Sequence, residues 1–185
     1  MSNRCLCRSG TMSTNYQIQV AGFGGQGIVF LVKLMALCSK IKGVGCLGTE
    51  NHGMSQRGGT VVCDIKIGNF HTPCINKGQA DLLIGLHSDE SLRVIQYLKP
   101  SGQAVVNAKS DFPKLNQEVF VDDAFSRAEN GDFPIQGINV FMLGVALSKV
   151  KNFPFSLDEI KQGLEEINPA VAEKNMEVLQ MGMAL

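Results

Sequence analysis

The stretch VAGFGGQGIV, residues 20–29, is the feature that most constrains how this chain can fold. Its glycines Gly22, Gly24 and Gly27 have the spacing G-x-G-x-x-G. Apolar alternation in YQIQV precedes the stretch, and an apolar helical pattern in IVFLVKLMALCSK follows it. A strand, a glycine turn and a helix in this order form the context in which the spacing binds dinucleotides. Glycine allows the tight turn, and the free N–H groups at the start of the helix favour an anion.

A nicotinamide or flavin site would also use an acidic residue about 20 positions further on, for the ribose hydroxyls. Glu50 stands close to that position, at the expected end of the second strand. The chain then enters the polar loop NHGMSQRGGT, where a doubly wound nucleotide domain would normally enter another helix. Arg57, Gly58 and Gly59 make this a second flexible, cationic loop. The loop is either a solvated connector or part of a composite surface for a phosphate-bearing ligand or a partner protein.

The composition narrows the possible partners. The 185 residues are enough for one domain with a substantial core. Lys and Arg total 17, as do Asp and Glu, so the chain lacks the basic bias typical of proteins that bind nucleic acid or anionic membranes. No apolar run reaches the roughly 18 residues that span a bilayer. We therefore expect neither nucleic acid nor a membrane as a partner.

The N-terminal segment MSNRCLCRSGTMST is polar and rich in small residues. It lacks the apolar core of a signal peptide, so we expect a cytoplasmic protein whose thiols stay reduced. Residues 1–15 are interpreted as a disordered lead-in and residues 16–185 as a single domain. The sequence leaves open whether Met1 or Met12 is the natural start.

The cysteines do not form a recognisable metal-binding pattern. Of the six, only Cys5 and Cys7 are close together in the sequence. Iron–sulfur clusters are typically held by four thiolates, and structural zinc by similar pairs. We expect no metal site in this chain and read Cys38, Cys46 and Cys63 as small core residues, although a site built from scattered cysteines stays open.

The remaining pattern predicts an α/β fold, a Rossmann-like three-layer sandwich. Residues 61–68 and 69–75, joined by Gly68-Asn69, suggest an antiparallel hairpin inserted after the second strand. The other expected strands are ADLLIGL, QAVVNA and EVFVDD, and the other expected helices are DESLRVIQYL, INVFMLGVALSKV, SLDEIKQGLEEI and the C-terminal AVAEKNMEVLQMGMAL. Ser88 and Ser156 are expected helix caps, the latter with Glu159 as a capping box. The sheet should be mostly parallel, with helices on both faces.

Five segments together resemble a known family. GFGGQGIV, HGMSQRGGTVVCDIKIG, ADLLIGL, NVFMLGVAL and KNMEVLQMG occur in the order seen in the gamma-type subunit of 2-oxoacid:ferredoxin oxidoreductases. The resemblance runs from about Gln17 to the C-terminus. His52 and Gln56 depart from the second loop of many gamma subunits, and this variant looks most like the beta subunit of indolepyruvate oxidoreductase.

The resemblance implies a subunit that is inactive alone. Enzymes of this family decarboxylate a 2-oxoacid on thiamine diphosphate, pass electrons through iron–sulfur clusters to ferredoxin, and transfer the acyl group to coenzyme A. Thiamine-binding alpha and beta subunits and a ferredoxin-like subunit would hold the thiamine diphosphate, magnesium and clusters. This chain would bind none of them alone, would share the coenzyme A site, and could form a homodimer when isolated.

The resemblance also points to ligand-binding residues in the two glycine-rich loops. Coenzyme A carries several phosphates, of which one could bind the backbone N–H groups from Gly24 to Gly27 and another Arg57. The candidate set is Gly22, Gly24, Gly25, Gln26, Gly27, Ser55, Arg57, Gly58 and Gly59. Gln26 either orients a ligand or bonds the neighbouring loop.

His52 is the one candidate for acid–base catalysis, because an imidazole titrates near neutral pH. Its alternative is a loop histidine that bonds the backbone. His71 and His87 lie in no recognisable constellation, and Met176, Met181 and Met183 are read as helix packing. Two other functions compete with the subunit hypothesis: an independent nicotinamide or flavin oxidoreductase, with Glu50 at the ribose, and an assembly module that docks an apolar face.

Overall fold

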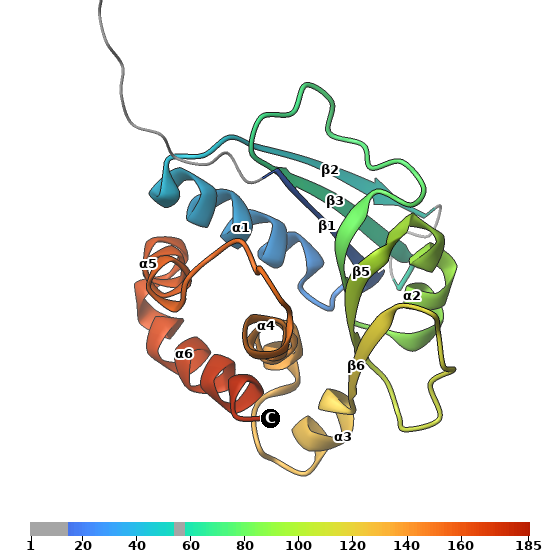
Figure 1. The fold of residues 1–185 in the computed structure, drawn as a ribbon. Coiled ribbons are helices and arrows are strands. Elements are labelled where there is room, and N and C mark those ends of the chain that lie inside the picture. The colour runs from blue at the N-terminus through green and yellow to red at the C-terminus, as the bar shows by residue number, and fades with distance from the viewer. Residues whose placement is uncertain (1–14, 54–57) are drawn as a thin grey trace, which may run out of the picture.

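A computed structural model describes residues 15–53 and 58–185 of the chain. Within them a six-stranded sheet has the order β2-β3-β1-β4-β5-β6 (Figure 1). The strands are β1 (Tyr16–Phe23), β2 (Cys46–His52), β3 (Thr60–Ile67), β4 (Ala80–Gly85), β5 (Leu98–Asn107) and β6 (Glu118–Asp122). β4 pairs in parallel with β1 and β5, and β6 in parallel with β5, whereas β3 is antiparallel to both β1 and β2. The α/β class and the mostly parallel sheet are thus confirmed.

The antiparallel hairpin is built from different strands than the sequence suggested. β2 pairs with β3, and residues 69–75 form no strand. Both edges of β3 are already paired, one with β1 and the other with β2. A strand after Gly68 would therefore have found no free edge of β3 with which to form a hairpin. The segment lies instead against the sheet, where the Asp64 carboxylate accepts from the Ile75 N–H at 2.8 Å.

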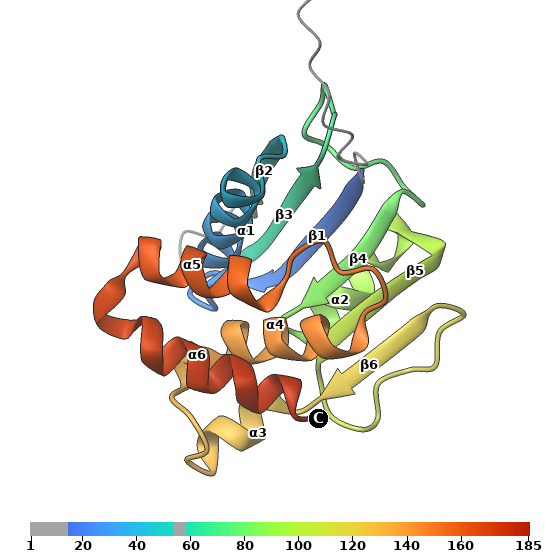
Figure 2. The same cartoon turned by 60° about the vertical axis from the view of Figure 1, so that its left-hand side comes forward.

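Helices cover the two faces of the sheet unequally. They are α1 (Ile28–Lys42), α2 (Ser88–Val94), α3 (Ala124–Glu129), α4 (Ile138–Lys149), α5 (Leu157–Ile167) and α6 (Pro169–Met183), with short 3-10 turns η1 (Ile95–Tyr97) and η2 (Ile135–Gly137). α1 and α4 pack on one face, and α5 and α6 lie outside them (Figure 2). The other face is covered by α2, η1 and loops, in a smaller core. No described helix has the length and apolar character needed to cross a bilayer.

The alternation of residues along the central strands supplies both cores. Ile18 and Val20 of β1 face the α1 side, whereas Ala21 faces the α2 side. Leu82 and Ile84 of β4 face α1 in the same way, and Leu83 between them faces α2. This period of two is the geometry of a strand buried on both faces.

Two glycines allow α4 and α6 to cross closely. A Cβ atom at Gly144 would overlap the carbonyl oxygen of Leu179, and one at Gly182 would overlap that of Phe141. Both glycines belong to the family-like segments NVFMLGVAL and KNMEVLQMG. Their role in the fold is therefore close helix packing.

The helix ends agree with the sequence signals in part. Ser156 caps α5, and Glu159 completes the capping box, as predicted. α2 is capped by His87 rather than Ser88, because the His87 side chain accepts from the Asp89 N–H.

The methionines near the C-terminus were predicted to pack between helices. Met176 and Met183 do pack against the core, whereas Met181 is exposed, so the prediction was wrong for Met181.

Candidate functional site

The glycine turn joins β1 to α1, and three of its glycines, Gly22, Gly25 and Gly27, occupy positions that a larger residue would strain or overlap. Gly25 and Gly27 have φ angles of 97° and 79°, in the left-handed region that glycine adopts without strain. A Cβ atom at Gly27 would also overlap the side-chain amide of Asn139. At Gly22 a Cβ atom would lie 2.6 Å from Gln26 Oε1. These three glycines thus serve the turn itself and the side chains packed around it.

The second glycine-rich loop lies directly against this turn. The Gly24 N–H donates to the Gly59 carbonyl oxygen at 2.9 Å. Between them is a hollow of about 560 Å³. Its lining is Phe23, Gly24, Gly25, Gly27, Ile28, Val29, His52, Gly58 and Val61. The two loops expected to form one composite surface are therefore adjacent; Ser55 and Arg57 lie outside the described residues.

Not every N–H group of the turn is free to bind a phosphate. Those of Gly24 and Gln26 are used internally, the latter with the Phe23 carbonyl oxygen at 3.2 Å. The N–H groups of Gly25 and Gly27 make no hydrogen bond within the described part of the chain. An anion at this turn would be held by these two groups and the first turn of α1.

The Gln26 side chain is engaged within the protein. Its Oε1 accepts from the Phe23 N–H at 2.7 Å, and its Nε2 donates to the Leu86 carbonyl oxygen at 3.2 Å. Asn107 Nδ2 donates to the same oxygen, also at 3.2 Å. Gln26 therefore ties the glycine turn to the end of β4, which is the second of the two roles expected for it.

His52 stands at the end of β2, on the rim of the first hollow. Its Nε2 lies 3.3 Å from Glu50 Oε2; the His52 side chain is 56% exposed and that of Glu50 39%. Glu50, the acidic residue that a dinucleotide site would use, has His52 as its partner, and the next described element after β2 is the strand β3, which pairs with it.

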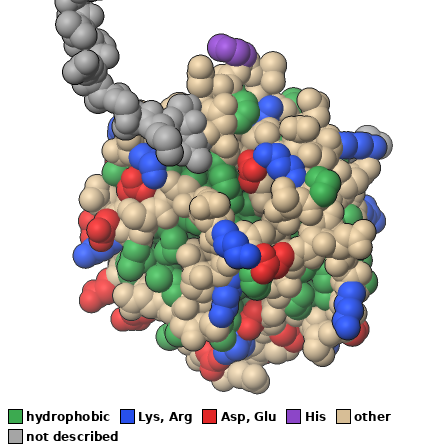
Figure 3. Space-filling view, viewed as in Figure 1, with side chains coloured by type: hydrophobic (Ala, Val, Ile, Leu, Met, Phe, Trp, Pro, Cys, Tyr) green, Lys and Arg blue, Asp and Glu red, His purple; other side chains and the backbone are tan. Residues whose placement is uncertain are grey.

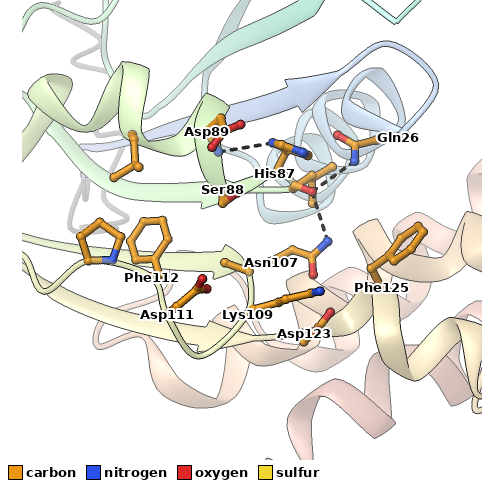
Figure 4. A pocket seen from close by; sticks show the side chains of 14 residues that line it. Gln26, His87, Ser88, Asp89, Asn107, Lys109, Asp111, Phe112, Asp123 and Phe125 are labelled. Carbon is orange, nitrogen blue, oxygen red and sulfur yellow. Dashed lines mark hydrogen bonds between the residues drawn. The ribbon is translucent and has the colours of Figure 1, made fainter.

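A second hollow opens on the other side of Gln26, at the carboxyl ends of β4 and β5 (Figure 4). Its volume is about 520 Å³. The rings of Phe23 and His87, 4.5 Å apart, stand between the two hollows. Sequence reasoning set His87 aside and did not consider Asn107, although His87 stands two residues after β4 and Asn107 ends β5, positions at which ligand-binding residues of such sheets are found.

The cysteines behave as core residues. Cys38 and Cys63 are fully buried, and Cys46 packs against the same core, as predicted. Burial raises the pKa of the Cys38 and Cys63 thiols to about 12, with nearby carboxylates adding to the effect. Among the described residues, no three His, Cys, Asp or Glu side chains are grouped so that they could hold a metal ion.

Charges of both signs are intermixed over the face seen in Figure 3. Such a surface produces no strong single-sign field on that side. The observation agrees with the zero net charge of the chain.

The family described as pyruvate ferredoxin/flavodoxin oxidoreductase matches residues 17–185. The chain belongs to this family. Among curated relatives, indolepyruvate oxidoreductase subunit IorB of Archaeoglobus fulgidus is 26% identical over 187 residues, covering 89% of this chain and 92% of that protein. The chain is therefore a relative of the subunits of 2-oxoacid:ferredoxin oxidoreductases, and the expected family is confirmed.

Two solved structures share the fold. The gamma subunit of a keto/oxoacid ferredoxin oxidoreductase from Geobacter sulfurreducens has a TM-score of 0.74 and 23% identity, covering 91% of this chain and 96% of that one. The 2-oxoglutarate:ferredoxin oxidoreductase from Magnetococcus marinus, with 2-oxoglutarate, coenzyme A and succinyl-CoA bound, has a TM-score of 0.76 and 17% identity. That match covers 92% of this chain and 30% of the larger one.

Proposed function

We propose that this chain is the gamma-type subunit of a thiamine diphosphate-dependent 2-oxoacid:ferredoxin oxidoreductase and contributes to its coenzyme A site. The observation that carries the proposal is the Gly24–Gly59 hydrogen bond, which joins the two family motifs into one rim around the first hollow. The Magnetococcus marinus relative binds coenzyme A, which supports the choice of ligand.

The turn fits a phosphate-bearing ligand. Two unbonded N–H groups, those of Gly25 and Gly27, lie at the start of the 15-residue helix α1, whose dipole favours negative charge there. Arg57 is the residue before Gly58, which lines the same hollow, and would supply a second, cationic contact. His52 on the rim would be available to exchange a proton with the ligand.

The rest of the machinery would belong to other chains. Thiamine diphosphate, when bound, supplies the electron sink for decarboxylation. The thiamine-binding alpha and beta subunits and a ferredoxin-like subunit would carry it with magnesium and the iron–sulfur clusters, and ferredoxin would be the acceptor. The complex would work in the cytoplasm, and this chain would be inactive alone, whether monomeric or a homodimer.

Arg57→Ala in the assembled complex tests the proposal. A charge-assisted hydrogen bond to phosphate is worth about 1.5–3 kcal/mol, or roughly ten- to a hundred-fold in apparent affinity for coenzyme A. Coenzyme A-dependent ferredoxin reduction should fall, while single-turnover release of carbon dioxide should hold. Arg57→Lys should recover only part of the loss, because an ammonium group cannot reproduce the guanidinium fork.

Two results would contradict the proposal. An equal fall in both assays would mean that Arg57 acts through folding or assembly. No change in either would mean that its loop is a connector and does not contact coenzyme A.

A further inference from the structure

The second hollow opens outside the carboxyl ends of β4 and β5, with Gln26 from the turn after β1 in its lining, and so lies beside the point at which open α/β sheets bind ligands. α1 leads from β1 over one face, whereas α2 leads from β4 over the other, so the connections diverge between these two neighbouring strands. Ligands of such sheets bind outside the carboxyl ends of the strands at this point of divergence. The hollow, of about 520 Å³, also falls in the usual size range of small-molecule sites.

Asn107, on the wall of this hollow, has a polar atom without a partner. The side chain is 8% exposed, and within the described residues its Oδ1 makes no hydrogen bond. Its orientation is fixed, because Nδ2 donates to the Leu86 carbonyl oxygen and a reversed amide would set two acceptors against each other. An unmet buried acceptor is costly, so a ligand N–H that reached it would bind favourably.

The oxygen lies on the side of the Asn107 amide away from Leu86, towards Lys109 and Asp123 (Figure 4). It is covered in the structure, so an incoming N–H must displace a lining side chain. Lys109 lines the hollow and is exposed, and such a side chain moves at little cost.

The other walls favour a flat, uncharged group. Phe125 of α3 lines the hollow with 47% of its surface exposed, and Phe112 and Leu92 add apolar surface. The lining carboxylates Asp89, Asp111 and Asp123 outnumber the single lysine, Lys109, which disfavours a phosphate at this position. His87 Nδ1 accepts from the Asp89 N–H. In the neutral imidazole the proton is therefore on Nε2, which is then a hydrogen-bond donor.

We propose that the second hollow binds an adenine ring, with its 6-amino group donating to Asn107 Oδ1 and one face against the Phe125 ring. Adenine presents an N–H donor at position 6, whereas hypoxanthine and guanine present a carbonyl oxygen there. That oxygen would face the Asn107 acceptor, so the site discriminates between the two kinds of purine. The adenine comes from coenzyme A or from a free adenine nucleotide.

The first test compares adenosine with inosine, titrated into the full chain and followed by NMR. The two nucleosides carry no phosphate and differ at position 6 of the base. Adenosine should bind saturably and at least about tenfold more tightly than inosine, the ratio that about 1.4 kcal/mol produces. Equal affinities, or no binding of adenosine, would overturn the proposal.

The second test uses exposed residues, so that folding is not at risk. Phe125→Ala should weaken adenosine binding about tenfold, within the range measured for stacking of a base on an aromatic ring. Ile135→Ala is the matched control, because Ile135 is 53% exposed on η2 and does not line the hollow. An equal response of the two variants would contradict the stacking contact.

A competition experiment identifies the source of the ring. If coenzyme A displaces adenosine, and Phe125→Ala weakens the binding of both ligands, the adenine of coenzyme A occupies the hollow. This outcome rests on the proposed function. If adenosine binds but coenzyme A does not displace it, the occupant is a free nucleotide. The Arg57 assays stay independent: a selective loss of coenzyme A use without adenosine binding would sustain the proposed function and overturn the adenine site.

Discussion

Gly24 and Gly59 are 35 positions apart in the sequence, yet the N–H of the first donates to the carbonyl oxygen of the second at 2.9 Å. The bond joins the turn after β1 to the loop between β2 and β3. The two loops become neighbours because β3 pairs antiparallel with β1, with Phe23 opposite Thr60. The hairpin therefore brings the second motif to the start of α1.

Gly27→Ala should destabilise the protein more than a left-handed glycine alone would explain. An alanine in this backbone conformation costs about 1–2 kcal/mol, and overlap with the Asn139 amide adds about 1–3 kcal/mol of overpacking. Gly43→Ala is the control, because Gly43 has a φ of 75° with open space around its Cβ position. Urea unfolding should show the larger loss for Gly27→Ala; equal losses would exclude the contribution of Asn139.

Gln26→Leu tests whether the amide holds the turn to the end of β4. The substitution removes the acceptor for the Phe23 N–H and the donor to the Leu86 oxygen. The free energy of unfolding should fall by about 1–3 kcal/mol, the cost of unpaired polar groups. Gln96→Leu is the control, because Gln96 is exposed and donates only to the Arg93 carbonyl oxygen. If both variants unfold at the same urea concentration, the Gln26 bonds contribute no stability.

The sequence predicted the elements whose signal is local. The G-x-G-x-x-G spacing identified the first β–α unit, and Ser156 with Glu159 identified the start of α5. The prediction that residues 69–75 pair with β3 was wrong. Strand pairing depends on which strand edges are already occupied, and this is a property of the whole sheet.

The sequence likewise predicted only one part of the candidate site. The contact between the two glycine-rich loops was expected from their motifs, whereas the hollow at Asn107 was not. Asn107 ends a strand whose pattern looks like ordinary core, and its unpaired oxygen follows only from the positions of Gln26 and Leu86. The partner of the Asn107 side chain, the Leu86 carbonyl oxygen, follows another strand and cannot be read from the segment that contains Asn107.

Gly144→Ala should disrupt the crossing of α4 and α6. The added methyl group meets the backbone of Leu179, which cannot rotate away, and the expected loss is about 1–3 kcal/mol or more. Gly163→Ala of α5 is the matched control, because its nearest neighbours are the side-chain ends of Leu34 and Cys38. Its cost should be smaller, since those side-chain atoms can shift whereas the Leu179 backbone cannot; the gain of about 1 kcal/mol in helix propensity is common to both variants. Thermal unfolding of the two variants makes the comparison, and an equal effect would contradict close packing at Gly144.

Asp123 caps α3, the helix that carries Phe125, and its contribution should depend on pH. Its carboxylate accepts from the Ser126 N–H at 3.0 Å and from the Ser126 hydroxyl at 2.7 Å. These bonds, with a smaller effect of Lys109, lower the pKa of the Asp123 carboxyl. A folded-state pKa below the unfolded value means that the stabilisation is present above the unfolded pKa, about 3.9, and is lost as the pH falls through the folded value.

Asp123→Ala should therefore lower the free energy of unfolding by about 1 kcal/mol at pH 7, the usual value of an N-cap. The difference from the unsubstituted chain should shrink as the pH falls below about 4, because protonation weakens the native cap as well. Asp123→Asn is the control: it keeps an oxygen acceptor and does not titrate, so it should lose little at pH 7. Urea unfolding of the three chains from pH 7 to pH 3 makes the measurement. A penalty for Asp123→Ala that stays constant over this range would show that the charge of the carboxylate does not contribute to the cap.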